Sequence, residues 1–229
     1  WKFNSNLTSA TNYLDGNVAG VAISVRVSDY GGNNVTKTFP DMTFHIDCNS
    51  GYSLDDLPFF KAIDDMGLAF IEQPLHFNDI LDHAELAKKI GTPICLDETI
   101  IDPRTAEQAI RVGACDYINI KPGRIGGLSN ALAVHDMAKN AGIPVWVGGM
   151  LESAVGGSIC VELATLENFT YPGDLFPSSR FYHRDLSEPK MEFYKGNLFR
   201  PFTNQLPTPN NSLLKEQTIR HKAVTKDPS

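Results

Sequence analysis

Short apolar runs that recur about every 25 residues constrain the fold of this chain more than any other feature. They start at residues 42, 67, 92, 116, 143 and 168, and each step leaves room for one strand, one helix and two short loops. This alternation is typical of βα units around a parallel sheet. Strands are therefore expected at 42–47, 67–72, 92–97, 116–121, 143–148 and, from a weaker pattern, 168–173.

Helix starts lie between these runs. Ser53, Asn78 and Asp102 each stand before an amphipathic stretch, where a side chain that accepts a hydrogen bond stabilises the first turn. The steady period favours a (β/α) barrel of the TIM type. A doubly wound open sheet is the alternative, and the absence of a GxGxxG or Walker pattern from the sequence counts against it.

The start of the chain fits the period less well. The segment VAGVAISVRV (18–27) predicts one strand, but one strand and most of one helix are missing before Met42, and a complete barrel needs about 250 residues. The barrel is therefore expected to be incomplete, without its second strand region. We expect a degenerate N-terminal segment with one barrel strand at 1–41, the (β/α) units at 42–190 and a C-terminal extension at 191–229.

The composition excludes several classes of partner. The 20 Lys and Arg residues and 27 Asp and Glu residues give a formal net charge of −7, which disfavours binding to nucleic acid or anionic lipid. No apolar run reaches the roughly 18 residues of a membrane span, and the first residues lack the pattern of a signal peptide. The four cysteines contain no CxxC pair. A cytoplasmic protein with reduced thiols is expected.

Charged residues end four consecutive predicted strands. Asp47, Glu72 and Asp97 are each 25 residues apart, and Lys121 ends the next strand. In a barrel these ends face the active-site mouth, so the side chains should converge. Any one of the acids alone could cap a helix or meet solvent. Three in the same register favour a site for a hard divalent cation, Mg²⁺ or Mn²⁺, because grouped carboxylates otherwise repel one another.

Lys121 is the candidate acid or base of this site. A lysine at a strand end is commonly a surface group, but beside a bound dication its pKa would fall and its amine could accept a proton. The expected chemistry is proton abstraction from a carbon next to a carboxylate, through an enediolate whose oxygens the metal holds. Asn49, on the same strand face as Asp47, and Glu98, next to Asp97, are candidates for supporting the metal ligands.

Six ordered segments resemble the enolase superfamily, and within its muconate-lactonising subgroup they are most similar to o-succinylbenzoate synthases and N-acylamino-acid racemases. The segments are HIDCNSGYS (45–53), FIEQPL (70–75), ICLDETI (94–100), NIKPGRIGG (119–127), VWVGGMLES (145–153) and YPGD (171–174).

This resemblance implies roles for individual residues. Asp47, Glu72 and Asp97 would bind Mg²⁺, and Lys121 would be the acid/base lysine of the sixth barrel strand. The segment after the seventh strand would line the substrate or support the ligands, through Gly148, Gly149, Met150 and Glu152. The implied activity is that of a lyase or isomerase acting on a small carboxylate, and the synthases belong to menaquinone biosynthesis.

The sequence also departs from the subgroup. It contains no KxK motif, which on the second barrel strand would supply a lysine facing Lys121. The residues before Val18 are too few for the subgroup's capping domain, and an arginine frequent in the racemases is Gly157 here. The alternative function is therefore a catalytically silent barrel that keeps metal binding or an assembly role. Unpaired strand edges of an incomplete barrel favour association into a homo-oligomer.

Overall fold

The structure is a computed structural model, and it describes residues 23–25, 44–193, 199 and 205–217. The chain divides into two compact units. The first comprises the residues up to Met150 together with Leu163–Asp174, and the second comprises Leu151–Glu162 and the residues from Leu175 onward. The divisions expected at residues 41 and 190 stay predictions.

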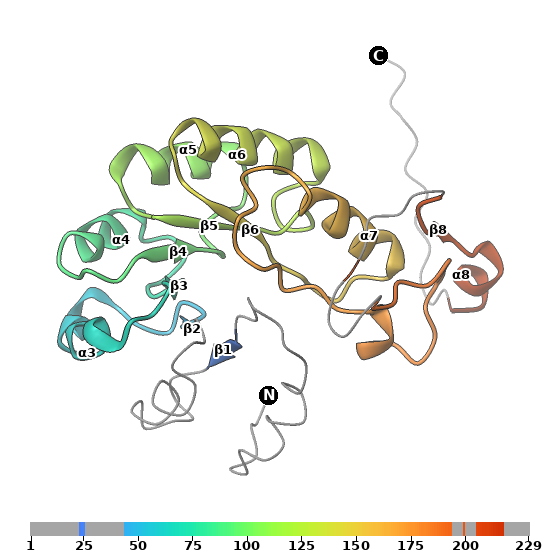
Figure 1. Cartoon of the computed structure of the whole chain (residues 1–229), viewed down its shortest axis with the longest axis horizontal. Coiled ribbons are helices and arrows are strands. Elements are labelled where there is room, and N and C mark those ends of the chain that lie inside the picture. Colours follow the sequence, from blue (N-terminus) through green and yellow to red (C-terminus); the bar gives the residue numbers. More distant parts are fainter. Residues whose placement is uncertain (1–22, 26–43, 194–198, 200–204, 218–229) are drawn as a thin grey trace, which may run out of the picture. The chain divides into compact units, whose positions relative to one another are not determined.

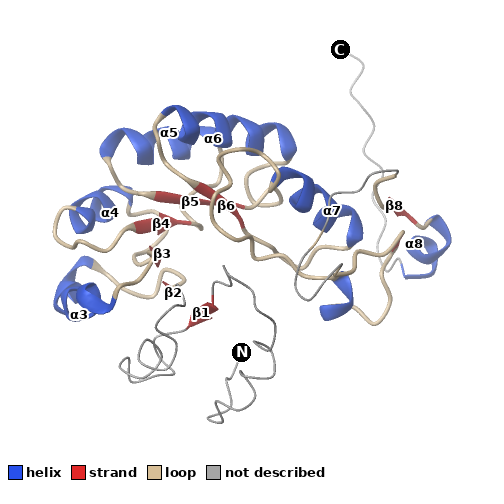
Figure 2. Ribbon diagram, in the orientation of Figure 1, coloured by secondary structure: helices blue, strands red, loops and turns tan. Residues whose placement is uncertain are grey.

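The first unit is built on a parallel sheet of six strands in sequential order (Figures 1 and 2). The strands are β1 (Ile23–Val25), β2 (Phe44–Asp47), β3 (Ile71–Glu72), β4 (Ile94–Leu96), β5 (Tyr117–Ile120) and β6 (Val145–Val147). The sheet curves, and helices lie on its outer side (Figure 2). This arrangement confirms the prediction of an incomplete (β/α) barrel and excludes a doubly wound sheet, whose strand order is not sequential.

The first two strands of the sheet are direct neighbours. β1 pairs in parallel with β2, with Ile23 opposite Phe44. A second barrel strand would have to stand between them, so this pairing agrees with the expected loss of that strand. The gap predicted between residues 27 and 42 lies outside the described residues. The predicted strand at 168–173 is wrong, because this segment forms only an isolated bridge to β6, between Phe169 and Val145. A second isolated bridge joins the residues that directly follow the two segments, Gly148 and Asp174.

The outer helices lie between the strands, but of the three predicted helix starts only Asp102 directly precedes its α-helix. A 3₁₀ turn at Leu54–Asp56 separates Ser53 from the first outer helix. The outer helices are α3 (Leu57–Ile63), α4 (Ile80–Ala87), α5 (Pro103–Val112) and α6 (Leu128–Asn140). The start of α5 has a clear local cause: the Asp102 carboxylate accepts a hydrogen bond of 2.7 Å from the Thr105 amide, and Pro103 takes the first helical position. Helix α4 is capped by Asp79 rather than by Asn78.

Alternate residues of the strands face opposite sides of the sheet. The inner side carries a layer of rings, in which Phe70 lies 4.7 Å from His45 and 5.0 Å from Tyr117 between ring centroids. Trp146 and Tyr171 complete this aromatic layer. The other face buries an aliphatic set under the helices, which includes Ile71, Ile94, Leu96, Ile118, Ile120, Val145 and Val147.

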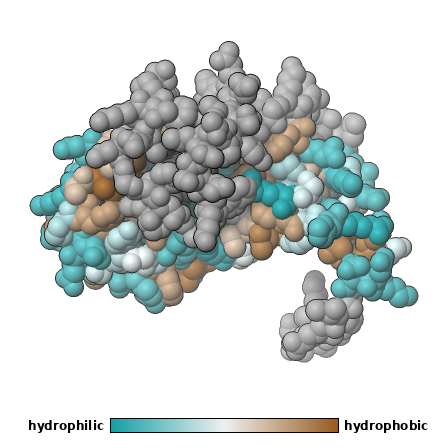
Figure 3. Space-filling model, turned by 90° about the horizontal axis from the view of Figure 1, so that it is seen from below, coloured by the Kyte–Doolittle hydropathy of each residue, from teal (hydrophilic) through white to brown (hydrophobic). Residues whose placement is uncertain are grey.

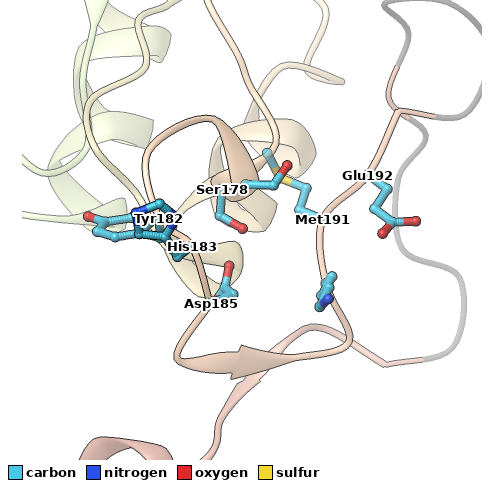
Figure 4. A pocket seen from close by; sticks show the side chains of 8 residues that line it. Ser178, Tyr182, His183, Asp185, Met191 and Glu192 are labelled. Atoms are coloured by element: carbon cyan, nitrogen blue, oxygen red, sulfur yellow. The ribbon is translucent and has the colours of Figure 1, made fainter. Parts of the chain in front are cut away.

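The second unit contains α7 (Ala154–Leu163) except its last residue, a short 3₁₀ turn at Ser178–Arg180, the antiparallel strands β7 (Ser187–Glu188) and β8 (Thr208–Pro209), and α8 (Asn211–Gln217). Asp185 anchors it, because its carboxylate accepts hydrogen bonds of 2.8 Å from the amides of Ala154 and Ser187. Asp185 also lines a small pocket, with Tyr182 and His183 on one side and Met191 on the other (Figure 4).

The described surface is mixed in character, with hydrophobic side chains scattered among hydrophilic ones on the face in Figure 3. In the described part of the chain, no helix is both long and apolar enough to span a membrane. The four cysteines are free thiols, and burial raises the pKa of Cys115 to about 12. Such thiols are protonated and unreactive near neutral pH.

Candidate metal and proton-transfer site

The four predicted strand-end residues meet at one edge of the sheet. Asp47 and Glu72 are the last residues of β2 and β3 and pair directly across the sheet. Asp97 directly follows the last residue of β4, and Lys121 directly follows the last residue of β5. Because the four strands are consecutive neighbours, their carboxyl ends lie side by side.

Glu72 is a buried carboxylate of the group, with 3% of its surface exposed. The Asn119 amide donates a hydrogen bond of 2.7 Å to Oε1, and Nε2 of His45 lies 3.6 Å from Oε2. Burial, followed by the charges of Asp47 and Asp97, raises the pKa of Glu72 well above its ordinary value. Its charged form is therefore unfavourable without further positive charge nearby.

Asn49 connects two other carboxylates. Its backbone amide donates to Asp47 Oδ1 at 2.9 Å, and its side-chain amide donates to Asp47 Oδ2 at 2.8 Å and to Glu98 Oε1 at 3.3 Å. Burial and the charge of Asp97 raise the pKa of both Asp47 and Glu98. The Oε2 atom of Glu98 is buried without a hydrogen-bond partner. The structure thus places Asn49 and Glu98 beside the predicted ligands.

Asp97 has two cationic neighbours. Nζ of Lys121 donates a hydrogen bond of 2.7 Å to Oδ2, and the guanidinium of Arg124 pairs with Oδ1. Burial alone would lower the pKa of Lys121, but Asp97 outweighs it and raises that pKa. The expectation of a lowered pKa assumes a dication beside Lys121. In the structure its direct neighbour is a carboxylate, which favours the ammonium form.

The charges of this group fit a divalent cation. Four carboxylates stand against two cationic side chains, and three of the carboxylates have raised pKa values. Buried carboxylate oxygens are the ligands that Mg²⁺ prefers. Among the described side chains, no three His, Cys, Asp or Glu groups are arranged to bind a metal as they stand. Binding by all three predicted ligands therefore requires their side chains to move from this arrangement.

The end of β6 passes close to this group. A methyl at Gly148 would overlap the Asn119 amide and the Cε atom of Lys121, so a side chain there would displace one or both of them. Met150 is 47% exposed. The predicted roles of Gly149 and Met150 at the substrate stay predictions. The same holds for Glu152, which belongs to the second unit.

Sequence reasoning did not assign several neighbours of the carboxylates. His45 and Asn119 stand two residues before Asp47 and Lys121, and the two-residue period of a strand would have placed them on the same face. Arg124 gives no such signal, because it reaches Asp97 through the turn that follows β5. Gln73 directly follows Glu72, and only the paired strands reveal its contacts.

Comparison with known proteins identifies the family of this chain. A family model described as Enolase C-terminal domain-like matches residues 33–202. An N-succinylamino acid racemase from Amycolatopsis sp is 51% identical over 149 residues, which are 65% of this chain and 40% of that protein. An o-succinylbenzoate synthase from Geobacillus stearothermophilus is 47% identical over 162 residues, which are 71% of this chain and 43% of that protein.

A solved structure shares the fold. The crystal structure of an enolase superfamily member from Listeria innocua Clip11262 matches with a TM-score of 0.82 and 35% identity, over 92% of this chain and 57% of that one. The region matched in the two curated relatives is less than half of their length. These relatives are enzymes, and the resemblance inferred from the six sequence segments is confirmed. The chain belongs to the Enolase C-terminal domain-like family of the enolase superfamily.

Proposed function

We propose that this chain carries the Mg²⁺-dependent proton-transfer site of an enzyme of the o-succinylbenzoate synthase or N-acylamino-acid racemase type. The reaction removes the proton from the carbon next to a substrate carboxylate. The observation that carries the proposal is the group formed by Asp47, Glu72 and Asp97 with Lys121, whose Nζ lies 2.7 Å from Asp97. The similarity to an N-succinylamino acid racemase and an o-succinylbenzoate synthase supports the choice of reaction.

Asp47, Glu72 and Asp97 would hold the metal ion. When bound, Mg²⁺ would supply positive charge that stabilises the negative charge developing on the substrate carboxylate. The hydrogen bond from Asn119 orients Glu72. The aromatic layer beneath the carboxylates excludes water from that side, which strengthens the electrostatic interactions above it.

Lys121 would move the proton at its Nζ atom. Its Nζ atom lies 2.7 Å from Asp97, and its side chain is 14% exposed and therefore partly accessible to solvent. Paired with Asp97, it is the ammonium, the form that returns a proton to carbon. The base form requires this pairing to be broken, because the Asp97 charge favours the protonated amine.

The alternative proposal is a metal-binding barrel without turnover. It is favoured by the absence of a KxK motif from the sequence, because two-base racemisation needs a proton donor on each face of the carbon. The loss of one acid or base lowers a rate by roughly 10²–10⁴-fold. In both proposals the carboxylates bind the cation. Association into a homo-oligomer is a separate proposal, and light scattering after size-exclusion chromatography tests it.

Exchange of the α proton for deuterium distinguishes the two functions. N-succinylamino acids in D₂O are followed by NMR with and without Mg²⁺, and calorimetry with Mn²⁺ measures metal binding separately. We expect Mg²⁺-dependent exchange that Lys121→Ala abolishes and that the control Lys139→Ala, at an exposed ion pair with Glu167, leaves unchanged. Mn²⁺ binding without exchange would favour the silent barrel. A wild type that binds no Mn²⁺ would contradict both proposals.

A further inference from the structure

The side chain of Gln73 is completely buried between the ends of β3 and β4. Its Oε1 atom accepts hydrogen bonds from the amides of Asp97 and Thr99, each 3.0 Å long. Its Nε2 atom donates to the Leu75 carbonyl at 3.0 Å and to the Thr99 hydroxyl at 2.8 Å. Two accepted and two donated bonds use the full capacity of a carboxamide. The orientation of Gln73 is therefore fixed.

These bonds connect the two segments that carry predicted metal ligands. Gln73 directly follows Glu72, and its backbone amide still belongs to the sheet, because it donates to the Cys95 carbonyl at 2.8 Å. Strand β4 ends at Leu96, so Asp97 lies beyond it. There the carboxamide of Gln73, rather than a neighbouring main chain, bonds the Asp97 amide.

The backbone of Gln73 is adapted to this contact. Its φ angle is 38°, in the left-handed region that residues other than glycine rarely adopt. This conformation turns the chain directly after Glu72 while the side chain faces the end of β4. Nearby, the imidazole Nε2 of His83 accepts a hydrogen bond of 3.2 Å from the Leu75 amide, which holds the following turn.

We propose that Gln73 is a positioning residue that holds the Asp97 backbone in the register needed for Asp97 and Glu72 to share one cation. This inference rests on the proposed metal-binding function. Gln73 acts through the main chain of Asp97, so it touches neither the cation nor the substrate. Groups that orient metal ligands in this indirect way commonly change metal affinity by about 10–100-fold when they are removed.

A purely structural role would have a different consequence. Asp64 anchors the opposite end of the same strand segment, because its carboxylate accepts hydrogen bonds from the amides of Gly91 and Thr92 at 2.9 and 2.6 Å. Loss of the hydrogen bonds of Gln73 or of Asp64 should lower the free energy of unfolding. Of these two anchors, Gln73 is bonded to a predicted ligand and Asp64 is not, so Asp64→Ala is the matched control for Gln73→Leu.

The test measures Mn²⁺ affinity of the full chain by calorimetry, at a temperature where circular dichroism shows each variant folded. Hydrogen exchange at the Asp97 amide, read by NMR without metal, reports the bond directly. We expect Gln73→Leu to bind Mn²⁺ about tenfold or more weakly and to exchange the Asp97 amide faster. Asp64→Ala should keep wild-type affinity within about twofold, since its bonds lie at the far end of β4.

Each outcome decides between the explanations. Wild-type affinity in Gln73→Leu, or an equal loss in Asp64→Ala, would overturn the positioning role and leave the proposed function intact. A wild type without Mn²⁺ affinity would overturn the proposed function and this inference with it. If Gln73→Leu does not fold, Thr99→Val takes its place, because it removes a hydrogen-bond partner of the carboxamide. Unchanged Mn²⁺ affinity and unchanged Asp97 exchange in Thr99→Val would then overturn the inference.

Discussion

The Cε methylene of Lys121 occupies the space that a side chain would need at Gly148. β5 and β6 pair in parallel with Ile120 opposite Val147, so the two residues leave the sheet side by side. A methyl at Gly148 would overlap Lys121 and the Asn119 amide. The missing side chain at Gly148 therefore gives Lys121 its path to Asp97.

Gly148→Ala should displace Lys121 from Asp97. We expect the free energy of unfolding to fall by about 1–3 kcal/mol, because the added methyl overpacks a buried contact. The rate of deuterium exchange into N-succinylamino acids should also fall, because Lys121 is displaced. The control is Gly123→Ala, in the turn after β5, where a methyl meets nothing within 4 Å. Wild-type exchange in Gly148→Ala would show that the position of Lys121 does not depend on Gly148.

Glu72→Gln should stabilise the protein in EDTA while weakening its metal binding. The substitution removes a buried charge that burial, Asp47 and Asp97 make unfavourable. A gain of about 1 kcal/mol corresponds to a rise in melting temperature of roughly 2–4 °C for a chain of this size. The control Glu107→Gln, at an exposed position on α5, should change neither the melting temperature nor the metal affinity. A lower melting temperature in Glu72→Gln would mean that the hydrogen bond from Asn119 outweighs the repulsion.

The buried imidazole of His83 should make stability depend on pH. Burial lowers its pKa below 6.5, and its Nε2 atom accepts a hydrogen bond from Leu75, which requires the neutral form. Its contribution is fully present above about pH 6.5 and is lost as the pH falls through the folded-state pKa, because the unfolded chain takes up the proton first. The slope is at most about 1.4 kcal/mol per pH unit.

Urea unfolding between about pH 7.5 and pH 5 measures this slope. His83→Gln should flatten the curve, and the exposed control His76→Gln should leave it unchanged. His45, whose pKa burial lowers to about 4, adds a slope of the same sign to all three proteins. An equal slope in wild type and His83→Gln would contradict the prediction.

Asp185→Asn should destabilise the second unit. In Asp185→Asn an NH₂ group replaces one of the two carboxylate oxygens, so the amide of either Ala154 or Ser187 loses its hydrogen-bond acceptor. This loss should lower the free energy of unfolding by about 1–3 kcal/mol. Burial acts to raise the pKa of Asp185, but hydrogen bonds that include those from Ser178 and Ser187 lower it overall. Its contribution is therefore present above about pH 3.8 and is lost as the pH falls through the lower folded-state pKa.

Hydrogen exchange at the first turn of α7 measures this effect. We expect faster exchange at Ala154 in Asp185→Asn than in wild type. The control Glu192→Gln changes an exposed carboxylate at the same pocket and should leave that exchange unchanged (Figure 4). Equal protection of Ala154 in Asp185→Asn would show that the carboxylate is not the anchor of α7.

Local sequence patterns predicted the parts of the site that a strand carries by itself. The 25-residue period located β2 to β6, and it placed Asp47 and Glu72 at strand ends because each run of apolar residues stops at an acid. The start of α5 at Asp102 was readable for the same reason, since its cap bonds only residues within one turn. The prediction of a strand at 168–173 was wrong because this segment pairs with β6 only at an isolated bridge and forms no continuous ladder of paired residues.

Patterns within the sequence were enough to predict the order of the strands, the register of the acids and the presence of one lysine among them. These features depend on the periodicity of apolar residues, which is visible within short segments of the sequence. Three contacts become visible only in the folded chain: Asp97 pairs with Lys121 and Arg124, Gln73 bonds the Asp97 amide, and Gly148 makes room for Lys121. Such contacts join residues on different strands, so they depend on pairing, burial and side-chain packing that no local pattern encodes.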